Sequence, residues 1–368
     1  MKVKIKMSEF FLELFSEEIP SKLQVNARKS LLENLQKFFK DNEVSIKGNL
    51  NVFSTPNRLI VYVDKITKKI SKKSEEVRGP NIKAPDEALE GFVRSNNITK
   101  KKVFKKKTDK GEFYFYKKPS QKINTSDLLK ENISDILSKI SWSKSMKWSD
   151  YNLFWGRPLK SILSVFDGKK LDFNFHHLKS SNTTFIDKES EEKTKSFNNF
   201  KSYNSYFKSQ GILIDQEKRK SFISNELIKL SNKKKLKINL KKELLEEITN
   251  IVEKPKILLC EFDKKYLMIP KEILIITMQN HQKYFPTFDK KEDLTNNFFV
   301  VADTKDTKGF VKLGNERVVE ARLSDAEFFW KRNRSQNLVK QISKLKNINY
   351  FKGLGSYFDK VQRMRKLC

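Results

Sequence analysis

Cysteine and histidine are scarce in this sequence of 368 residues, which contains two cysteines and three histidines. Cys260 and Cys368 are too few for a disulfide framework, and such sparse use suits a reducing cytoplasm. No His-x-x-x-His or Cys-x-x-Cys spacing occurs, and the pair His176-His177 has no further histidine or cysteine near it. Because zinc sites need such groups of ligands, we expect no metal site.

Long apolar runs and glycine-rich phosphate loops are also missing. No uninterrupted apolar segment approaches the length of a membrane span, and the basic N-terminus lacks the apolar core of a signal peptide. Neither Gly-x-x-x-x-Gly-Lys nor Gly-x-Gly-x-x-Gly after a strand is present. His281 has no carboxylate or nucleophile close to it in sequence, which disfavours a hydrolase that uses it as a base. We therefore predict no membrane partner, no cofactor and no catalytic residue in this chain.

Positive charge is what the sequence has in excess. It contains 76 lysines and arginines against 45 aspartates and glutamates, a net charge of +31. A field of this sign attracts polyanions, chiefly nucleic acid. A lysine bias of the whole coding sequence is an equal alternative, because only 12 of the 76 cations are arginine. The arginine positions carry more information, since only the planar guanidinium makes bidentate contacts with phosphate.

The apolar patterns predict an α+β protein of several small mixed domains, with antiparallel sheets and packed helices, followed by the start of an all-α region. Residues 10–15 (Phe-Phe-Leu-Glu-Leu-Phe) form a buried strand, and residues 256–262 form another, with residues 266–269 as its partner. The helix after the first strand has an apolar stripe of Leu23, Ala27, Leu31, Leu35 and Phe38. The predicted domains are 1–66 (α+β), 67–170 (α+β), 171–255 (a variable loop and helical segment), 256–332 (α+β) and 333–368 (the start of a helical domain).

Two stretches combine side chains that are rarely found together in this lysine-rich chain. Residues 278–286 read Met-Gln-Asn-His-Gln-Lys-Tyr-Phe-Pro and join a predicted helix to a predicted strand. Residues 314–330 form a helix, on which Arg322 and Asp325, three residues apart, can pair as a structural or as a functional ion pair. The core stripe of this helix comprises Val319, Leu323, Ala326 and Trp330.

These two stretches and residues 12–20 (Leu-Glu-Leu-Phe-Ser-Glu-Glu-Ile-Pro) together resemble the beta subunit of the bacterial two-subunit glycyl-tRNA synthetase. Shorter matches follow the order of that family, at residues 54–59, 78–80, 90–92, 144–148, 157–158 and 354–361. The resemblance covers essentially the whole chain, and the ordered series makes it specific. Residues 182–185 depart from it, because they lack the Gly-His-Arg that the family carries near this point.

The resemblance implies a division of labour between two subunits. In the family, ATP (with Mg) and glycine bind at the alpha subunit, which forms the aminoacyl-adenylate, and the beta subunit binds tRNA-Gly within a cytoplasmic alpha2-beta2 tetramer. Family beta subunits continue into an HD-type helical domain and an anticodon-binding domain, so we expect an N-terminal part, with residues 333–368 at the start of the HD-type domain. The implied function is a tRNA-binding accessory subunit of glycine–tRNA ligase in translation. A general RNA-binding or scaffold protein on the same fold is the alternative.

Motif residues with cationic, amide or aromatic side chains are the candidates for tRNA contact, since such groups bind phosphate, ribose hydroxyls and unstacked bases. These candidates are Arg58, Arg78, Lys144, Lys147, Arg157, Gln279, His281, Gln282, Lys283 and Tyr284. The candidates for a structural or interface role are Asn315, Arg317, Arg322, Asp325 and Phe329. A turn-capping role is an equal alternative for Arg58. The aromatic strand at residues 113–116, close to a lysine run, is more readily explained as core than as a surface that stacks bases.

Overall fold

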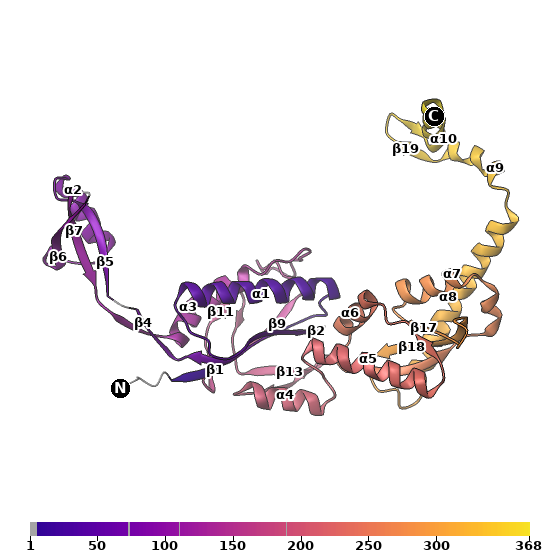
Figure 1. Ribbon diagram of the computed structural model, residues 1–368, viewed down its shortest axis with the longest axis horizontal. Coiled ribbons are helices and arrows are strands. Elements are labelled where there is room, and N and C mark those ends of the chain that lie inside the picture. Colours follow the sequence, from indigo (N-terminus) through magenta and orange to yellow (C-terminus); the bar gives the residue numbers. More distant parts are fainter. Residues whose placement is uncertain (1–5, 73, 110, 189) are drawn as a thin grey trace. The chain divides into compact units, whose positions relative to one another are not determined.

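The computed structural model describes residues 6–368 apart from residues 73, 110 and 189 (Figure 1). The chain forms two compact units, Met1–Arg219 and Lys220–Cys368. Helices and small antiparallel sheets occur in both units, which confirms the predicted α+β class. No helix among the described residues combines the length and the apolar character needed to cross a lipid bilayer.

A five-stranded antiparallel sheet forms the centre of the first unit, in the order β10-β9-β1-β3-β2. Its strands are β1 (Met7–Ser16), β2 (Leu50–Thr55), β3 (Arg58–Thr67), β9 (Leu159–Phe166) and β10 (Lys169–Lys170). β1 lies between β3 and β9, and helices cover both faces of the sheet. From Phe10 to Phe15 its sequence is apolar at every position except Glu13, as expected for a strand that is buried on both sides.

Alternate residues of β1 pack against different helices. Phe10, Leu12 and Leu14 belong to a core that also contains residues of α1 (Ser21–Asp41) and α3 (Thr125–Ser138). Phe11 belongs to a second core with α4 (Phe200–Ser209). The side-chain period of two in a strand explains this division.

Helix α1 confirms the predicted apolar stripe over most of its length. Leu23, Leu31 and Leu35 are buried on one face. In the last turn, Phe39 is buried and Phe38 only partly so. Position 39 follows Leu35 by four residues and therefore continues the same stripe.

The central sheet runs across the predicted domain boundary at residue 66. β9 lies in the predicted second domain but pairs with β1 from Phe10↔Phe166 onward. The predicted variable segment, residues 171–255, supplies Phe173 and Phe197 to the two cores of the first unit, and the division between the compact units falls after Arg219. A pairing between such distant segments leaves no mark in a local sequence pattern.

A smaller sheet, which we call the three-stranded module (residues 75–118), lies within the first unit. Its strands, in the order β5-β7-β6, are β5 (Glu75–Asn81), β6 (Val103–Thr108) and β7 (Gly111–Lys118). Helix α2 (Asp86–Ser95) and a short 3₁₀ turn, Lys100–Lys102, connect β5 to β6. A two-stranded ladder of β4 (Lys69–Lys72) and β8 (Gln121–Asn124) joins the module to the rest of the unit.

The remainder of the first unit consists of short strands and helices, in agreement with the weak strands predicted there. The strands are β11 (Asn174–Phe175), β12 (Leu178–Lys179), β13 (Thr183–Asp187) and β14 (Ser190–Ser196). Helix α5 (Gln216–Lys233) then leads along the chain into the second unit.

The second unit is built on a four-stranded antiparallel sheet in the order β15-β17-β18-β16. The strands are β15 (Lys237–Ile238), β16 (Lys256–Glu261), β17 (Phe285–Phe288) and β18 (Leu294–Ala302). The helical elements that accompany them are α6 (Lys242–Ile251), η2 (Lys264–Met268), α7 (Lys271–Ile276), η3 (Thr277–His281) and α8 (Phe310–Ser335). The prediction of a strand at residues 266–269 is wrong: this segment lies in and after the 3₁₀ helix η2, and the partner of β16 is β18. A short apolar run does not by itself distinguish a strand from a helical turn.

Helices cover both faces of this second sheet as well. Phe298 of β18 packs with Leu274 of α7 and Leu323 of α8 in one core, whereas its neighbour Phe299 packs with Leu227 of α5 in another. The predicted stripe of α8 is confirmed at Val319 and Leu323, which are fully buried, and Ala326 and Trp330 are half-buried.

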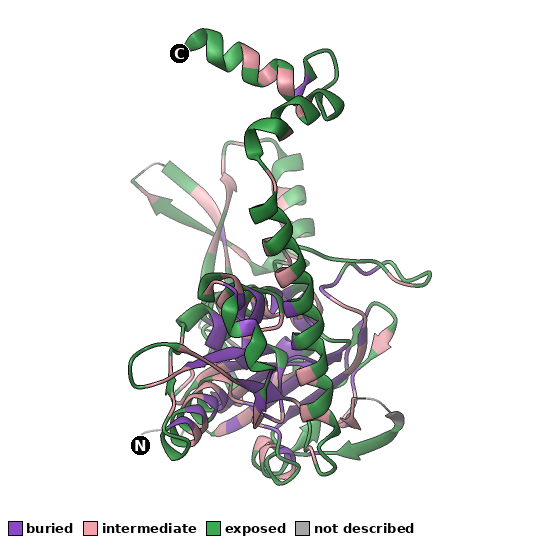
Figure 2. Ribbon diagram, turned by 90° about the vertical axis from the view of Figure 1, so that its right-hand side faces the viewer, coloured by how far each residue is buried: buried purple, intermediate pink, exposed green. Residues whose placement is uncertain are grey.

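The last part of the chain is helical, as predicted, with a short hairpin that the sequence did not indicate. Its elements are α9 (Leu338–Gln341), η4 (Ile342–Asn347), β19 (Asn349–Phe351), β20 (Gly355–Ser356) and α10 (Tyr357–Leu367). Figure 2 shows the buried residues on the sheets and on the helix faces that cover them, whereas α10 has none.

Candidate nucleic-acid interface

Arg58 is the first residue of β3, and its side chain is completely buried. Its Nη1 donates to Glu13 Oε2 at 3.2 Å, and its Nη2 donates to the Phe185 carbonyl at 2.8 Å. The guanidinium lies between two rings, with its carbon 4.6 Å from the ring centroid of Phe15 and 4.5 Å from that of Phe207. This corrects the prediction of a phosphate contact for Arg58, because the guanidinium is enclosed by protein on every side.

Glu13 is the ion-pair partner of Arg58, and its side chain is also completely buried. Its carboxylate accepts hydrogen bonds from the hydroxyls of Thr184 and Tyr203 as well as from Arg58. A buried carboxylate needs such compensation, since an isolated charge in a protein interior is costly. Glu13 of β1, Arg58, Thr184 and Tyr203 thus form one buried hydrogen-bonded network. The sequence did not reveal this network, because its members are far apart in the chain.

Lys144, Lys147 and Arg157 lie in a segment that we call the basic loop (residues 144–157). An isolated β-bridge between Met146 and Trp155 closes it, with backbone hydrogen bonds of 2.8 and 3.1 Å. Both lysines are exposed, and each lies within two residues of one end of the bridge. Arg157 is half-buried, lies two residues beyond the other end, and donates to the Gly156 carbonyl at 2.9 Å. The bridge therefore brings the three predicted cations together at the neck of one loop.

Aromatic side chains hold the basic loop in place. Trp155 is buried, and its ring centroid lies 5.0 Å from that of Trp142. Tyr151 stacks on His177 at 3.6 Å, whereas Phe154 remains 63% exposed. A cavity of about 190 Å³ opens beside these rings, lined by Ser138, Trp142, Leu153, Phe154, Trp155 and His176. The backbone segment that carries the three cations is therefore fixed by packed aromatic side chains.

Arg78 lies in β5 of the three-stranded module and is exposed. Its guanidinium carbon lies 3.5 Å from the ring centroid of Phe113 in β7, so the two planar groups are in direct contact. An arginine that rests on a ring keeps its outer side free for a ligand.

Residues 278–286 divide into inner and outer side chains. Helix α7 passes into the π-helical turn η3, and Lys283, with a φ of 61°, then reverses the chain so that Tyr284 N donates to the Met278 carbonyl at 2.9 Å. Gln279 and Tyr284 are buried, His281 is exposed, and Gln282 is half-buried. π-helical turns often occur at functional sites, and here the turn separates a structural half of the motif from a half that solvent can reach.

Two contacts fix the inner half of this motif. Tyr284 Oη donates to Asn315 Oδ1 of α8 at 2.5 Å, and Asn315 Nδ2 donates to the Val311 carbonyl at 2.7 Å. Burial raises the pKa of Tyr284 to about 12, so the phenol stays protonated and keeps donating. Lys283 Nζ pairs with Glu247 of α6 at 3.0 Å. Among the predicted tRNA candidates, Lys283 and Tyr284 are thus engaged in contacts within the protein, and Gln279 is buried.

Helix α8 carries the other predicted interface residues on its exposed side. Arg317, Arg322, Asp325 and Phe329 are exposed, and Phe329 retains 56% of its accessible surface. Arg322 and Asp325 both lie in the part of the chain that the structure describes, and no ion pair joins them. Only Asn315 among these candidates is tied into the core of the second unit, through Tyr284.

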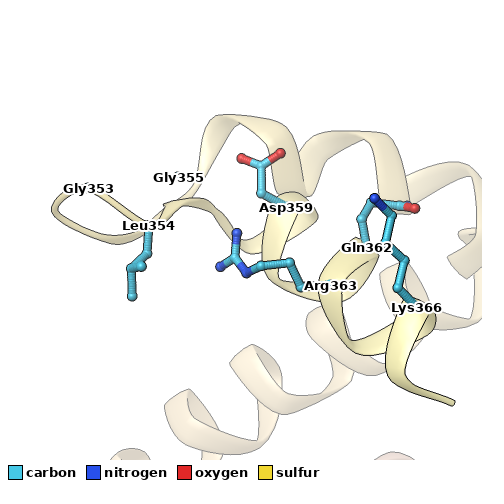
Figure 3. A pocket seen from close by; sticks show the side chains of 7 residues that line it. All are labelled: Gly353, Leu354, Gly355, Asp359, Gln362, Arg363 and Lys366. Carbon is cyan, nitrogen blue, oxygen red and sulfur yellow. The ribbon is translucent and has the colours of Figure 1, made fainter.

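A cavity of about 490 Å³ at the C-terminal end lies against α10. Figure 3 shows Arg363 extending toward the turn that contains Gly353, Leu354 and Gly355, with Asp359 in the first turn of the helix. The Asp359 carboxylate accepts from Ser356 N at 2.7 Å and Ser356 Oγ at 2.8 Å, and these bonds hold its pKa below the ordinary value. Asp359 is therefore occupied as a helix cap. Within the described residues, no group of three histidine, cysteine or carboxylate side chains could hold a metal ion.

Comparison with known proteins decides the family. The family model described as glycyl-tRNA synthetase beta subunit matches residues 10–368. This chain belongs to that family. The glycine–tRNA ligase beta subunit of Rickettsia felis is 35% identical over 365 residues, which are 98% of this chain and 55% of that protein. The same subunit of Rickettsia prowazekii is 35% identical over 363 residues, 98% of this chain and 54% of that protein. The chain spans about half the length of the curated relatives it matches.

In this chain, some of the motifs that it shares with the glycyl-tRNA synthetase beta subunit family hold buried side chains and others hold exposed ones. The motif at residues 54–59 contains the buried Arg58, whereas those at residues 78–80 and 144–148 present exposed cations. The sequence did not single out Phe104 of β6, whose side chain retains 37% of its accessible surface. Its only signal was a phenylalanine inside a run of lysines, a setting in which an aromatic ring has few apolar neighbours.

Proposed function

We propose that this chain is a tRNA-binding part of a glycine–tRNA ligase beta subunit. It works with a separate alpha subunit, which binds ATP with Mg and glycine and forms the adenylate, in a cytoplasmic alpha2-beta2 assembly that attaches glycine to tRNA-Gly. The names of the relatives support the ligase role, and their match runs through 98% of this chain. The alternative of a general RNA-binding or scaffold protein is not favoured, because 98% of this chain aligns with proteins named as glycine–tRNA ligase beta subunits.

The observation that carries the proposal is the neck of the basic loop. Three cations, Lys144, Lys147 and Arg157, are held within two residues of one backbone bridge. Lysine ammonium and arginine guanidinium groups in such a cluster bind the phosphates of a nucleic acid and release its condensed counterions. Binding through phosphates positions an RNA without reading its bases, which suits a subunit whose partner carries the chemistry.

Titration of a tRNA-Gly transcript with the purified chain, with the alpha subunit and with both tests the proposal. We expect the chain to bind the transcript by itself and to increase the affinity of the alpha subunit for it. The triple variant Lys144→Ala, Lys147→Ala, Arg157→Ala should weaken binding about ten-fold or more at moderate salt. It should also reduce the salt slope by roughly 0.7–0.9 for each phosphate that the variant no longer neutralises.

The matched control removes three exposed lysines from α1 of the same unit, Lys22, Lys37 and Lys40. This control lowers the net charge by the same three units as the basic-loop variant. It should weaken tRNA binding by less than about two-fold, because the three lysines of α1 lie outside the proposed site. If both triple variants weaken binding equally, the basic loop is not the site. If the unaltered chain neither binds the transcript nor adds affinity to the alpha subunit, the proposed function is wrong.

A further inference from the structure

One face of the three-stranded module is not covered by its helix. A Cβ on Gly79 of β5 would lie 2.9 Å from the ring of Phe92, so α2 packs against the face on which Gly79 lies. Arg78 is paired with Phe115 and Asn81 with Phe113, so Gly79 and Pro80 form a bulge opposite Tyr114. Because Phe115 and Tyr114 point to opposite faces, Arg78 lies on the other face. Arg78 is exposed there, as is Phe104. We call this second face the open face.

The strand register determines which side chains share the open face. Phe115 of the central strand β7 is paired with Phe104 on β6 and with Arg78 on β5. The next residue of β7 on that face, Phe113, is paired with Lys106 on β6. Because neighbouring strands lie about 4.8 Å apart, the backbones of Phe104 and Arg78 are separated by about 10 Å. Three phenylalanines and two cations thus occupy one side of three strands.

The rings on the open face form two flat platforms. The centroids of Phe104 and Phe115 lie 6.2 Å apart with an angle of 28° between the planes, and Phe115 is buried beneath its neighbours. The guanidinium carbon of Arg78 lies 3.5 Å from the centroid of Phe113. Lys106 lies over Phe115 at 5.6 Å and also pairs with Glu76. The outer platforms are therefore the ring of Phe104 and the guanidinium plane of Arg78.

The charge around these platforms indicates what they bind. Residues 75–118 contain twelve lysines and arginines against seven aspartates and glutamates, a net charge of +5. Six of the lysines lie at residues 100–102 and 105–107, immediately before and within the strand that carries Phe104. Phosphate groups are attracted to such a strand, and unpaired bases stack on phenylalanine rings and on guanidinium planes. A duplex does not offer its base faces to a flat surface, so the complement is an unpaired stretch of RNA.

We propose that the open face of β5, β6 and β7 binds one or two unpaired nucleotides of the RNA, with a base stacked on Phe104 and a second on the Arg78 guanidinium. The inference rests on the proposed function, because tRNA supplies the unpaired nucleotides. It assigns a separate role to each of two surfaces. The basic loop holds phosphates, and the open face holds bases.

Three variants test this assignment in the full chain with the tRNA-Gly transcript. Phe104→Ala should weaken binding about 5- to 150-fold, the effect of losing one base–aromatic stack, and should leave the salt slope unchanged because no phosphate contact is removed. Phe104→Trp should restore affinity, since indole is a larger platform. The control Phe222→Ala removes a ring of similar exposure, 40%, from α5 and should change affinity by less than about two-fold.

Each outcome of this experiment has one meaning. Phe104→Ala with unaltered tRNA affinity overturns the inference and leaves the proposed function standing. The same holds if Phe104→Ala weakens only binding to the alpha subunit, which would make the open face a protein interface. If the unaltered chain does not bind the transcript, the proposed function itself fails, and the inference fails with it. Ultraviolet cross-linking of the transcript to Phe104, identified by mass spectrometry, supports the inference independently of affinity.

Discussion

Replacing Arg58 by methionine leaves the buried carboxylate of Glu13 without the cation that it contacts at 3.2 Å. Both side chains are completely buried, so water cannot replace the lost charge. Removing one partner of such a pair costs about 3–5 kcal/mol of unfolding free energy. The guanidinium lies between the rings of Phe15 and Phe207, and methionine keeps an apolar contact with both rings. The loss of unfolding free energy therefore comes mainly from the missing charge and not from the change in side-chain volume.

The measurement is urea unfolding followed by tryptophan fluorescence. Three of the four tryptophans, Trp142, Trp148 and Trp155, lie in the first unit, so a Trp330→Phe background makes the signal specific to the unit that contains Arg58. With a slope of about 2 kcal/mol per molar urea, Arg58→Met should lower the midpoint by about 1.5–2.5 M. The control Arg78→Met removes an exposed arginine of the same unit and should change the unfolding free energy by less than about 0.5 kcal/mol.

A second variant separates buried charge from general disruption. In Glu13→Gln, Arg58→Met, a neutral amide still accepts from the hydroxyls of Thr184 and Tyr203. This double variant should be more stable than Arg58→Met alone, since no unpaired charge remains in the interior. A loss below about 1 kcal/mol for Arg58→Met, or a double variant less stable than the single one, would refute the reasoning.

The remaining predictions concern the second unit. Cys260 is 1% exposed, and burial raises the pKa of its thiol to about 12, so a thiol reagent should modify Cys368 alone in the native chain and both cysteines in denaturant; two reactive thiols in the native chain would contradict this burial. Tyr284→Phe removes the hydrogen bond to Asn315 and should lower the unfolding free energy by about 1 kcal/mol at neutral pH, measured by urea unfolding. Burial raises the pKa of Tyr284 from about 10 in the unfolded chain to about 12, so the stabilising effect of its phenol is complete below pH 10 and decreases as the pH rises toward 12. In urea unfolding the variant should therefore lose less stability than the unaltered chain over that range, and an equal loss in both would show that Tyr284 does not titrate there.

Several elements were predictable because their causes are local. β1 is apolar at successive positions, and α1 and α8 carry stripes at helical spacing, so their type and their buried faces follow from periodicity. The ordered motifs were sufficient to indicate the family, since each is a short run of neighbouring residues. In the candidate interface, the exposure of Lys144 and Lys147 also agreed with their place in a polar segment.

Other features depended on residues that meet only in the folded chain. Periodicity shows that a face is buried but not what covers it, so the pairing of β1 with β9 could not be predicted. Arg58 became structural because Glu13 from β1 and Tyr203 from α4 lie beside it. Phe104 stayed exposed because α2 covers the other side of its sheet. The sequence by itself determined most of the helices and strands and indicated the family. The tertiary structure decided which cations and rings are left for a ligand, because burial of a charge or a ring depends on distant neighbours.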